Sequence, residues 1–279
     1  MPYKCFQVNV ADQVAHIVLS RPEKRNSMIP EFWQELPQAI RELDEGGGNR
    51  VIVISSTGPH FSSGMDLAAF ENADPTSTNQ TAKASDLHHG IRFYEGAQRL
   101  QASFTALEHC RIPVIAAIQG ACIGGAVDMV TACDMRYAVD DAYFSVFETN
   151  IGMTADVGTF PRLIKLIPEG IARELAYTGR KFSAEEAEKH GLVNRVFRSH
   201  ESMMEEVLTI ARQIASQAPL AVYGCKRLIN YSRDHSTADT LDYAAIWNAS
   251  MLQKSEIQEA LAARAESRHG NFVDLPASK

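Results

Sequence analysis

The chain has 279 residues, 45% of them hydrophobic, and its 27 basic and 34 acidic residues give a net charge of −7. This length and apolar content suffice to bury a full core, as one large domain or as one domain with an appendage. The acidic balance argues against a nucleic-acid-binding surface, and no stretch approaches the roughly 18 uninterrupted apolar residues of a membrane-spanning helix.

The first elements alternate between strand and helix. Residues 6–9 and 14–19 have the pattern of two strands around a turn at Ala11-Asp12, which predicts a β-hairpin. Residues 30–43 have helical periodicity with a proline near the first turn, and a run of three glycines follows the predicted end of this helix. An α/β protein is the fold class that this alternation favours.

Two short apolar runs rich in β-branched residues, 51–54 and 114–118, predict strands that are buried on both faces of a sheet. Between them, residues 71–85 are rich in Asn, Asp, Thr, Ser and Ala and have no periodic apolar face. That composition predicts a mobile loop that can act as a lid beside a site. A long helix over residues 87–109 is expected to follow the loop.

From residue 171 onward the pattern predicts helix almost throughout. The expected helices cover residues 171–177, 184–189, 202–216, 220–231, 241–251 and 255–267. We therefore expect a sheet-bearing core over residues 1–200. A helical region over residues 201–279 is expected to cap this core or to form an oligomer.

The five cysteines are widely scattered and include no Cys-x-x-Cys pair, which predicts reduced thiols and no metal site. The N-terminal segment lacks the pattern of a secretory signal peptide, and the final residues Ala277-Ser278-Lys279 differ from the Ser-Lys-Leu peroxisomal signal. From these observations we expect a soluble protein in the cytoplasm.

Three carboxylic acids lie among apolar neighbours, Asp128 directly after the Gly124-Gly125 pair and then Glu148 and Asp156. Burial disfavours the ionised carboxylate and raises its pKa toward the range useful for proton transfer. Any one of these acids alone is more simply explained as a helix cap or a paired structural acid. Three of them beside a glycine turn favour general acid and base catalysis.

Two glycine-containing loops, 61–67 and 119–125, each follow a predicted core strand. Glycine permits turns that aim backbone N–H groups inward, and a helix that begins near Gly125 adds the positive end of its dipole. Each loop alone is also compatible with an ordinary strand-to-helix turn. Because the second loop runs directly into Asp128, we expect the two loops to form an oxyanion hole for a thioester that enolises.

At these residues the chain resembles the crotonase (enoyl-CoA hydratase/isomerase) superfamily, over residues 20–28, 61–67, 113–128, 132–136 and 191–196. The resemblance implies a spiral core of β-β-α turns, a C-terminal helical region, and homotrimers that often pair into homohexamers. It implies an acyl-CoA substrate, with CoA as part of the substrate and no separate cofactor. It also implies oxyanion-hole N–H groups on Met65 and Gly125, and CoA contacts from Lys24 and Arg25.

The acids distinguish members of this superfamily. Hydratases carry glutamate at the first two acid positions and a small uncharged residue at the third, whereas this chain has Asp128, Glu148 and Asp156. With the stretches 122–128 and 131–137, this set resembles the Δ3,5-Δ2,4-dienoyl-CoA isomerases. The chain departs from their pattern at Ala126 and at the three positions around Glu148, which are Phe147, Thr149 and Asn150.

The resemblance implies an isomerase that converts 3,5-dienoyl-CoA to 2,4-dienoyl-CoA in the β-oxidation of unsaturated fatty acids. In this hypothesis Glu148 removes the C2 proton and Asp128 protonates C6. Asp156 either tunes the other two acids by like-charge repulsion or exchanges the distal proton itself. One alternative is an enoyl-CoA hydratase or another crotonase-type reaction. A noncatalytic crotonase-fold binding protein is a second alternative, which the acidic net charge disfavours for RNA.

Overall fold

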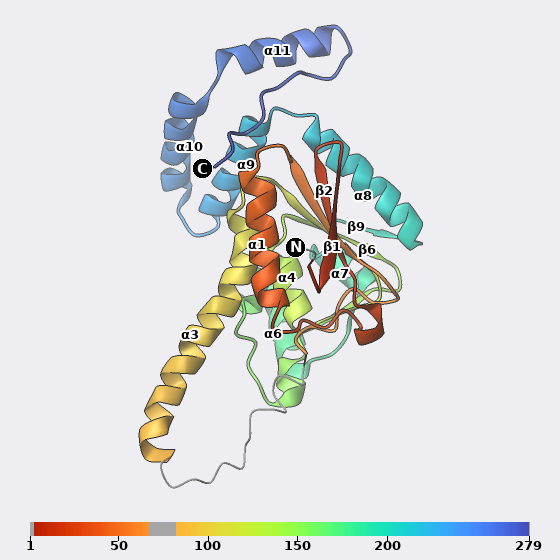
Figure 1. Ribbon diagram of the computed structural model, residues 1–279, viewed down its shortest axis with the longest axis vertical. Helices are drawn as coiled ribbons and strands as arrows, with labels where there is room; N and C mark the ends of the chain where they lie inside the picture. Colours follow the sequence, from red (N-terminus) through yellow and green to blue (C-terminus); the bar gives the residue numbers. More distant parts are fainter. Residues whose placement is uncertain (1–2, 67–81, 279) are drawn as a thin grey trace.

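The computed structural model describes residues 3–66 and 82–278, and at its centre is a six-stranded sheet (Figure 1). The strand order is β1-β2-β3-β4-β6-β9. The strands are β1 (Phe6–Ala11), β2 (Val14–Leu19), β3 (Val51–Ser56), β4 (Val114–Ile118), β6 (Met135–Val139) and β9 (Arg195–Phe197). β1 and β2 are antiparallel, whereas the other neighbours are parallel.

A second, three-stranded sheet has the order β5-β7-β8, with β5 (Ala121–Ile123), β7 (Tyr143–Ser145) and β8 (Phe182–Ser183). β5 follows β4 after two residues, so the chain passes directly from the large sheet to the small one. An isolated bridge between Ser62 and Cys122 attaches the loop after β3 to this small sheet. The small sheet therefore lies where the two predicted oxyanion loops meet.

The predicted hairpin and the two buried strands are confirmed. The turn between β1 and β2 has Asp12 and Gln13 at φ 51° and 63°, and left-handed residues at both turn positions match the twist of a tight hairpin. Every residue of β3 and of β4 is buried. Burial on both faces explains why their sequences are continuous apolar runs.

The helices are α1 (Phe32–Glu45), α3 (Ala82–His109), α4 (Gly125–Ala132), α5 (Thr159–Leu163), α6 (Glu169–Thr178), α7 (Ala184–His190), α8 (His200–Ala215), α9 (Pro219–Ser232), α10 (Thr237–Met251) and α11 (Lys254–Ala265). The described residues also contain two 3-10 helices, η1 (Pro22–Lys24) and η2 (Glu148–Ile151), which lie in loops. α3 begins at Ala82, before the predicted residue 87. Most of the loop predicted over 71–85 lies outside the described residues, and its last four residues belong to α3.

The prediction of nearly continuous helix after residue 171 is wrong at β8 and β9, while the expected helices there are present. Strands of two and three residues are too short to show a periodic apolar pattern, so the sequence carried no local signal for them. Their positions depend on pairing with β7 and β6, which is a tertiary contact.

The two faces of the large sheet are covered by different helices. Ile52 and Ile54 of β3 belong to a hydrophobic cluster with α1 and α3, whereas Val51 and Val53 pack against α8. Successive residues of a strand point to opposite faces, so one strand supplies both clusters. α8 therefore packs on the sheet, although it begins at the end of the predicted core. The division into residues 1–200 and 201–279 remains a prediction.

The C-terminal tail runs back along the body after α11 (Figure 1) and is fixed by Arg50, which directly precedes β3. The Arg50 guanidinium donates to the Phe272 carbonyl at 2.9 Å, to Asp274 Oδ1 at 2.8 Å and to the Ala215 carbonyl at 2.8 Å. Leu275, the residue after Asp274, is buried. These contacts tie the last described residues to the sheet.

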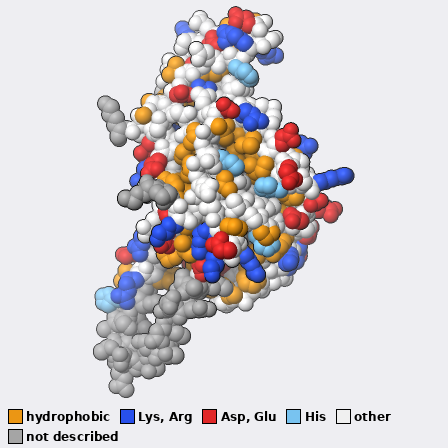
Figure 2. Space-filling model, turned by 45° about the vertical axis from the view of Figure 1, so that its right-hand side comes forward, with side chains coloured by type: hydrophobic (Ala, Val, Ile, Leu, Met, Phe, Trp, Pro, Cys, Tyr) orange, Lys and Arg blue, Asp and Glu red, His pale blue; other side chains and the backbone are white. Residues whose placement is uncertain are grey.

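On the face seen in Figure 2, acidic and basic side chains are interspersed around apolar areas. Among the residues that the structure describes, none of the helices combines the length and the apolar character that are needed to cross a membrane.

Candidate active site

Six of the candidate site residues named from the sequence line one cavity of about 310 Å³. They are Arg25, Met65, Gly125, Asp128, Glu148 and Asp156. Most of the remaining wall is apolar and comes from Ile123, Phe147, Ile151, Met153 and Val157. An apolar cavity with a few convergent polar groups is the usual form of a small-molecule site.

The backbone amides of Met65 and Gly125 lie side by side. A Cβ placed on Gly125 would be 3.6 Å from the Met65 nitrogen. At Gly64, with φ +79°, a Cβ would lie 2.4 Å from the Ile123 carbonyl oxygen, so the two loops can approach this closely only with glycine there. Within residues 3–66 and 82–278, neither the Met65 N–H nor the Gly125 N–H has a hydrogen-bond acceptor.

Strand-like pairing holds the two loops together. The Phe61 N–H donates to the Gln119 carbonyl at 2.8 Å, and the Ile123 N–H donates to the Ser62 carbonyl at 3.1 Å. The His60 Nδ1 atom accepts from the Ala121 N–H at 3.3 Å, which gives that histidine a structural role. These bonds fix the direction of the two unpaired amides, and fixed donors are what an oxyanion hole requires.

Asn26 fixes the neighbouring basic turn, and its importance was not evident from the sequence. It is buried, and its Nδ2 donates to the carbonyls of Thr57 at 2.9 Å and His60 at 3.0 Å. Arg25, the preceding residue, is exposed and lines the cavity, whereas Lys24 is exposed in η1. Arg25 is therefore part of the cavity wall. Lys24, the residue before it, is not among the described residues that line the cavity.

Asp128 lies on α4 with 1% of its surface exposed. Its Oδ1 atom accepts hydrogen bonds from the backbone N–H of Thr159 at 2.6 Å and from the Thr159 hydroxyl at 2.8 Å. Burial raises the pKa of this carboxyl to about 7; the Thr159 hydroxyl opposes the shift, and the nearby Glu148 adds to it. Asp128 is therefore suited to exchange a proton near neutral pH.

Glu148 begins η2, directly beside the glycine pair. A Cβ placed on Gly124 would be 3.2 Å from Glu148 Oε1, and the Oε2 atom is buried without a hydrogen-bond partner. Burial is the largest cause that raises the pKa of this carboxyl; backbone hydrogen bonds act in the opposite direction, and Asp156 raises it further. A carboxyl with an unpaired buried oxygen is a candidate base.

Asp156 is half-buried, and burial raises the pKa of its carboxyl. The Gln101 side chain donates to its backbone carbonyl at 2.7 Å, which ties this loop to α3. Together with Met65 and Met153, Asp156 also lines an adjacent cavity of about 520 Å³. The walls of this second cavity are largely apolar and include Trp33, Phe93 and Leu100. Asp156 thus lies where the two cavities meet.

The described part of the chain contains no group of three or more His, Cys, Asp or Glu residues that could hold a metal ion. All five cysteines are free thiols, and four of them are buried.

The sequence profile of the enoyl-CoA hydratase/isomerase family matches residues 9–275. The mitochondrial Δ(3,5)-Δ(2,4)-dienoyl-CoA isomerase of Mus musculus is 42% identical over 270 residues, which cover 95% of this chain and 81% of the relative. The peroxisomal Δ(3,5)-Δ(2,4)-dienoyl-CoA isomerase of Arabidopsis thaliana is 39% identical over 278 residues, 98% of each chain. Among solved structures, an enoyl-CoA hydratase from Bacillus anthracis superposes with a TM-score of 0.84 at 28% identity, covering 97% of this chain and 99% of that one.

These relatives contradict the expected cytoplasmic location, because they are named as mitochondrial and peroxisomal proteins. That expectation was based on the scattered cysteines, on the lack of a secretory signal pattern and on final residues that differ from Ser-Lys-Leu. Reduced thiols suit any reducing aqueous compartment, so they did not distinguish the cytoplasm from the interior of an organelle.

Proposed function

Because the chain belongs to the enoyl-CoA hydratase/isomerase family, we propose that it acts as a Δ3,5-Δ2,4-dienoyl-CoA isomerase in the β-oxidation of unsaturated fatty acids. The observation that carries this proposal is the cavity in which three acids, Asp128, Glu148 and Asp156, converge beside two unpaired amides. The dienoyl-CoA isomerases similar to this chain over nearly its whole length support the same reaction.

The thioester carbonyl oxygen of the substrate accepts hydrogen bonds from the N–H groups of Met65 and Gly125. Removal of a proton from C2 places negative charge on this oxygen, and preorganised amides stabilise that charge without rearranging. In other enzymes, loss of one such donor costs about 3 kcal/mol of transition-state stabilisation. The glycine-dependent contact between the two loops keeps both donors in place.

Glu148 is the base that removes the C2 proton. Its carboxyl lies against Gly124, next to the Gly125 amide, so a carbon adjacent to the bound carbonyl is within its reach. The unpaired Oε2 atom is the oxygen available to accept the proton. The raised pKa makes the carboxylate a stronger base than an exposed glutamate.

Asp128 is the acid that protonates C6. With a pKa of about 7, a substantial fraction of this carboxyl is protonated at neutral pH. The C2 proton leaves as Glu148 becomes protonated, the conjugated enolate carries the electron pair toward C6, and Asp128 gives up its proton there. Each turnover leaves Glu148 protonated and Asp128 ionised, so the two acids must exchange protons with each other or with water before the next cycle.

Asp156 influences both steps from the junction of the two cavities. As a neighbouring carboxyl it raises the pKa of Glu148, and its position suits exchange of the distal proton with water. The apolar cavity of about 520 Å³ accommodates the remainder of the acyl chain. Arg25 and Lys24 bind the CoA part of the substrate, and no separate cofactor takes part.

We also infer that the protein assembles as a homotrimer or a homohexamer. The outer helices α10 and α11 leave large apolar side chains exposed, among them Leu241, Ile246 and Leu261. Apolar side chains of this size, clustered on adjacent helices, commonly become buried at subunit interfaces. Sedimentation velocity on the full chain tests the assembly.

The experiment that tests the reaction is turnover of purified protein with a 3,5-dienoyl-CoA, with a 2-enoyl-CoA as the competing substrate. We expect an increase in ultraviolet absorbance as the diene becomes conjugated with the thioester, and little hydration of the 2-enoyl-CoA. Efficient hydration without isomerisation would instead identify an enoyl-CoA hydratase. Salt-dependent RNA binding without turnover of either thioester would identify a noncatalytic binding protein.

A further inference from the structure

We propose that Thr159 is a positioning residue for Asp128. It donates two hydrogen bonds to one carboxyl oxygen and leaves the other oxygen available to a ligand in the cavity. The donors are the backbone N–H, at 2.6 Å from Oδ1, and the side-chain hydroxyl, at 2.8 Å from the same atom. Asp128 lines the cavity, so Oδ2 is the oxygen left for a ligand there. The inference rests on the proposed function only in naming Asp128 as the proton donor.

Thr159 can serve Asp128 because of its place at the start of α5. The preceding residue, Gly158, has φ +130°, a conformation that L side chains rarely adopt. A Cβ on Gly158 would also lie 1.9 Å from Arg162 Nη1. The backbone at 158 therefore favours glycine, and a larger residue would also displace the Arg162 guanidinium. This conformation lets the Thr159 N–H reach Asp128 of α4.

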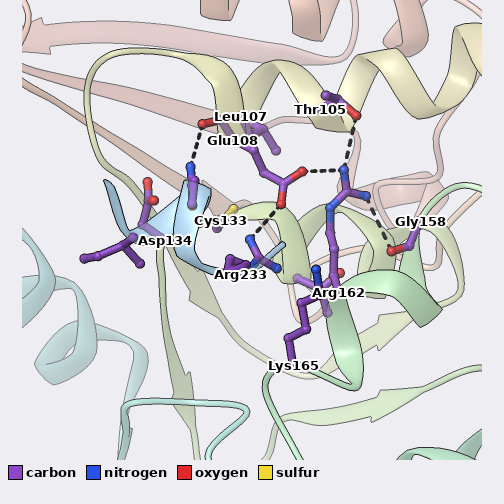
Figure 3. A network of polar contacts seen from close by, with 12 residues as sticks. Thr105, Leu107, Glu108, Cys133, Asp134, Gly158, Arg162, Lys165 and Arg233 are labelled. Carbon is purple, nitrogen blue, oxygen red and sulfur yellow. Dashed lines mark hydrogen bonds and ion pairs between the residues drawn. The ribbon is translucent and has the colours of Figure 1, made fainter. Parts of the chain in front are cut away.

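Arg162 anchors this short helix to α3, as Figure 3 shows. Its Nη2 donates to Glu108 Oε2 at 2.6 Å and to the Thr105 hydroxyl at 3.2 Å. The other Glu108 oxygen accepts from Arg233, which directly follows α9, at 2.9 Å. Arg162 and Glu108 are both largely buried, and a buried ion pair with added hydrogen bonds holds a defined geometry. α3 and α9 thus fix the segment that carries Thr159.

The two hydrogen bonds from Thr159 favour the ionised form of Asp128, because a carboxylate is the better acceptor. They oppose burial, which alone would raise the pKa of the carboxyl further and make it a weaker acid for proton delivery to C6. Other charged or titratable groups also act on Asp128: Glu148 of η2, Arg162 of α5 and Cys122 of β5, with Asp156 on the same cavity. A test of Thr159 must therefore leave all of these unchanged.

The matched variants are Thr159→Val, which removes the hydroxyl and keeps the shape, and Thr159→Ser, which keeps a hydroxyl. We expect Thr159→Val to lower kcat roughly tenfold with KM within about twofold, since the substrate contacts remain. The alkaline limb of the kcat profile should move up by about one pH unit, because loss of a bond to the carboxylate raises the pKa of Asp128. Thr159→Ser should recover most of both effects.

A titration that needs no activity separates this inference from the proposed function. The Asp128 carboxyl is followed by 13C NMR in aspartate-labelled protein, with Asp128→Asn to assign the signal. We expect the pH at the midpoint of the Asp128 titration to rise in Thr159→Val and to return toward the wild-type value in Thr159→Ser. If the wild type fails to isomerise a 3,5-dienoyl-CoA, the proposed function fails while this titration still decides the role of Thr159.

An unchanged Asp128 midpoint in folded Thr159→Val would overturn the inference, whatever the activity. Equal loss of kcat in the valine and serine variants would also overturn it, because packing and not the hydroxyl would then be responsible. Circular dichroism and thermal melting establish that each variant is folded. Should Thr159→Val prove unfolded, Thr159→Ala replaces it in both measurements under the same criteria.

Discussion

Oε1 of Glu148 lies 3.2 Å from the position that a Cβ would take on Gly124. The candidate base therefore packs against a residue that has no side chain, directly before the amide of Gly125. Gly124 also has φ +54°, which disfavours other residues. The same glycine thus shapes the oxyanion loop and makes room for the base, and substitution there tests both.

Gly124→Ala should lower kcat strongly, because the new methyl displaces the Glu148 carboxyl and strains the loop that carries the Gly125 amide. A decrease of roughly 10²-fold or more is expected, comparable to loss of one oxyanion donor. Steady-state kinetics with a 3,5-dienoyl-CoA measure it. Gly152→Ala is the matched control, since that glycine also has a positive φ, +74°, but no atoms lie within 4 Å of its Cβ position. Equal effects of the two variants would contradict this explanation.

Glu148→Gln should lower kcat by roughly 10²- to 10⁴-fold, the usual contribution of a general base, while KM changes little. The amide keeps the shape of the side chain but cannot accept the C2 proton. Loss of exchange of the C2 hydrogen with solvent, followed by NMR on the substrate, gives an independent readout. Turnover near the wild-type rate would show that another group is the base.

Activity should fall as the pH rises through about 7, because Asp128 must be protonated to deliver its proton and burial raises its pKa to about that value. Asp128→Asn should abolish most of the turnover and remove this limb from the residual profile. The control is the pH profile of substrate binding, which should not show the same limb. A rate that is flat across neutral pH would contradict the assignment of Asp128.

Asp128 should also make folding stability depend on pH. Its pKa is raised in the folded state above the unfolded value, so the folded state binds the proton more tightly. The resulting stabilisation is fully present below the unfolded pKa, near 3.8, and is lost as the pH rises toward about 7. Asp128→Asn should therefore raise the melting temperature relative to wild type by more at pH 8 than at pH 5. Identical differences at both values would contradict this linkage.

Arg50→Ala should lower the free energy of unfolding by about 1–3 kcal/mol, the range for hydrogen bonds to a charged group, because three contacts to the C-terminal part of the chain are lost. Urea denaturation measures the change, and kcat should be unaffected in the folded protein. Arg173→Ala is the control: its ion pair with Glu169 is exposed and should contribute less than about 1 kcal/mol. A similar loss in both variants would contradict the proposed role of Arg50.

The sequence was informative where the signal is local. Continuous apolar runs predicted β3 and β4, and acids among apolar residues identified three side chains that do line one cavity. The support for those acids could not be read from the chain, because it comes from distant residues. Thr159 binds an acid 31 positions away, and Arg162 is anchored by Glu108, 54 positions away. No periodicity or motif encodes such contacts, and the short strands β5 to β9 likewise depend on partners elsewhere in the fold.

The central claim is that separate acids act at opposite ends of the diene. Its most direct test is to determine by NMR the structure of the product formed from a 3,5-dienoyl-CoA in 2H2O. The account predicts a 2,4-dienoyl-CoA with deuterium at C6, because Asp128 exchanges with solvent and delivers its proton there. A product protonated at C4, or a hydrated 3-hydroxyacyl-CoA, would contradict it.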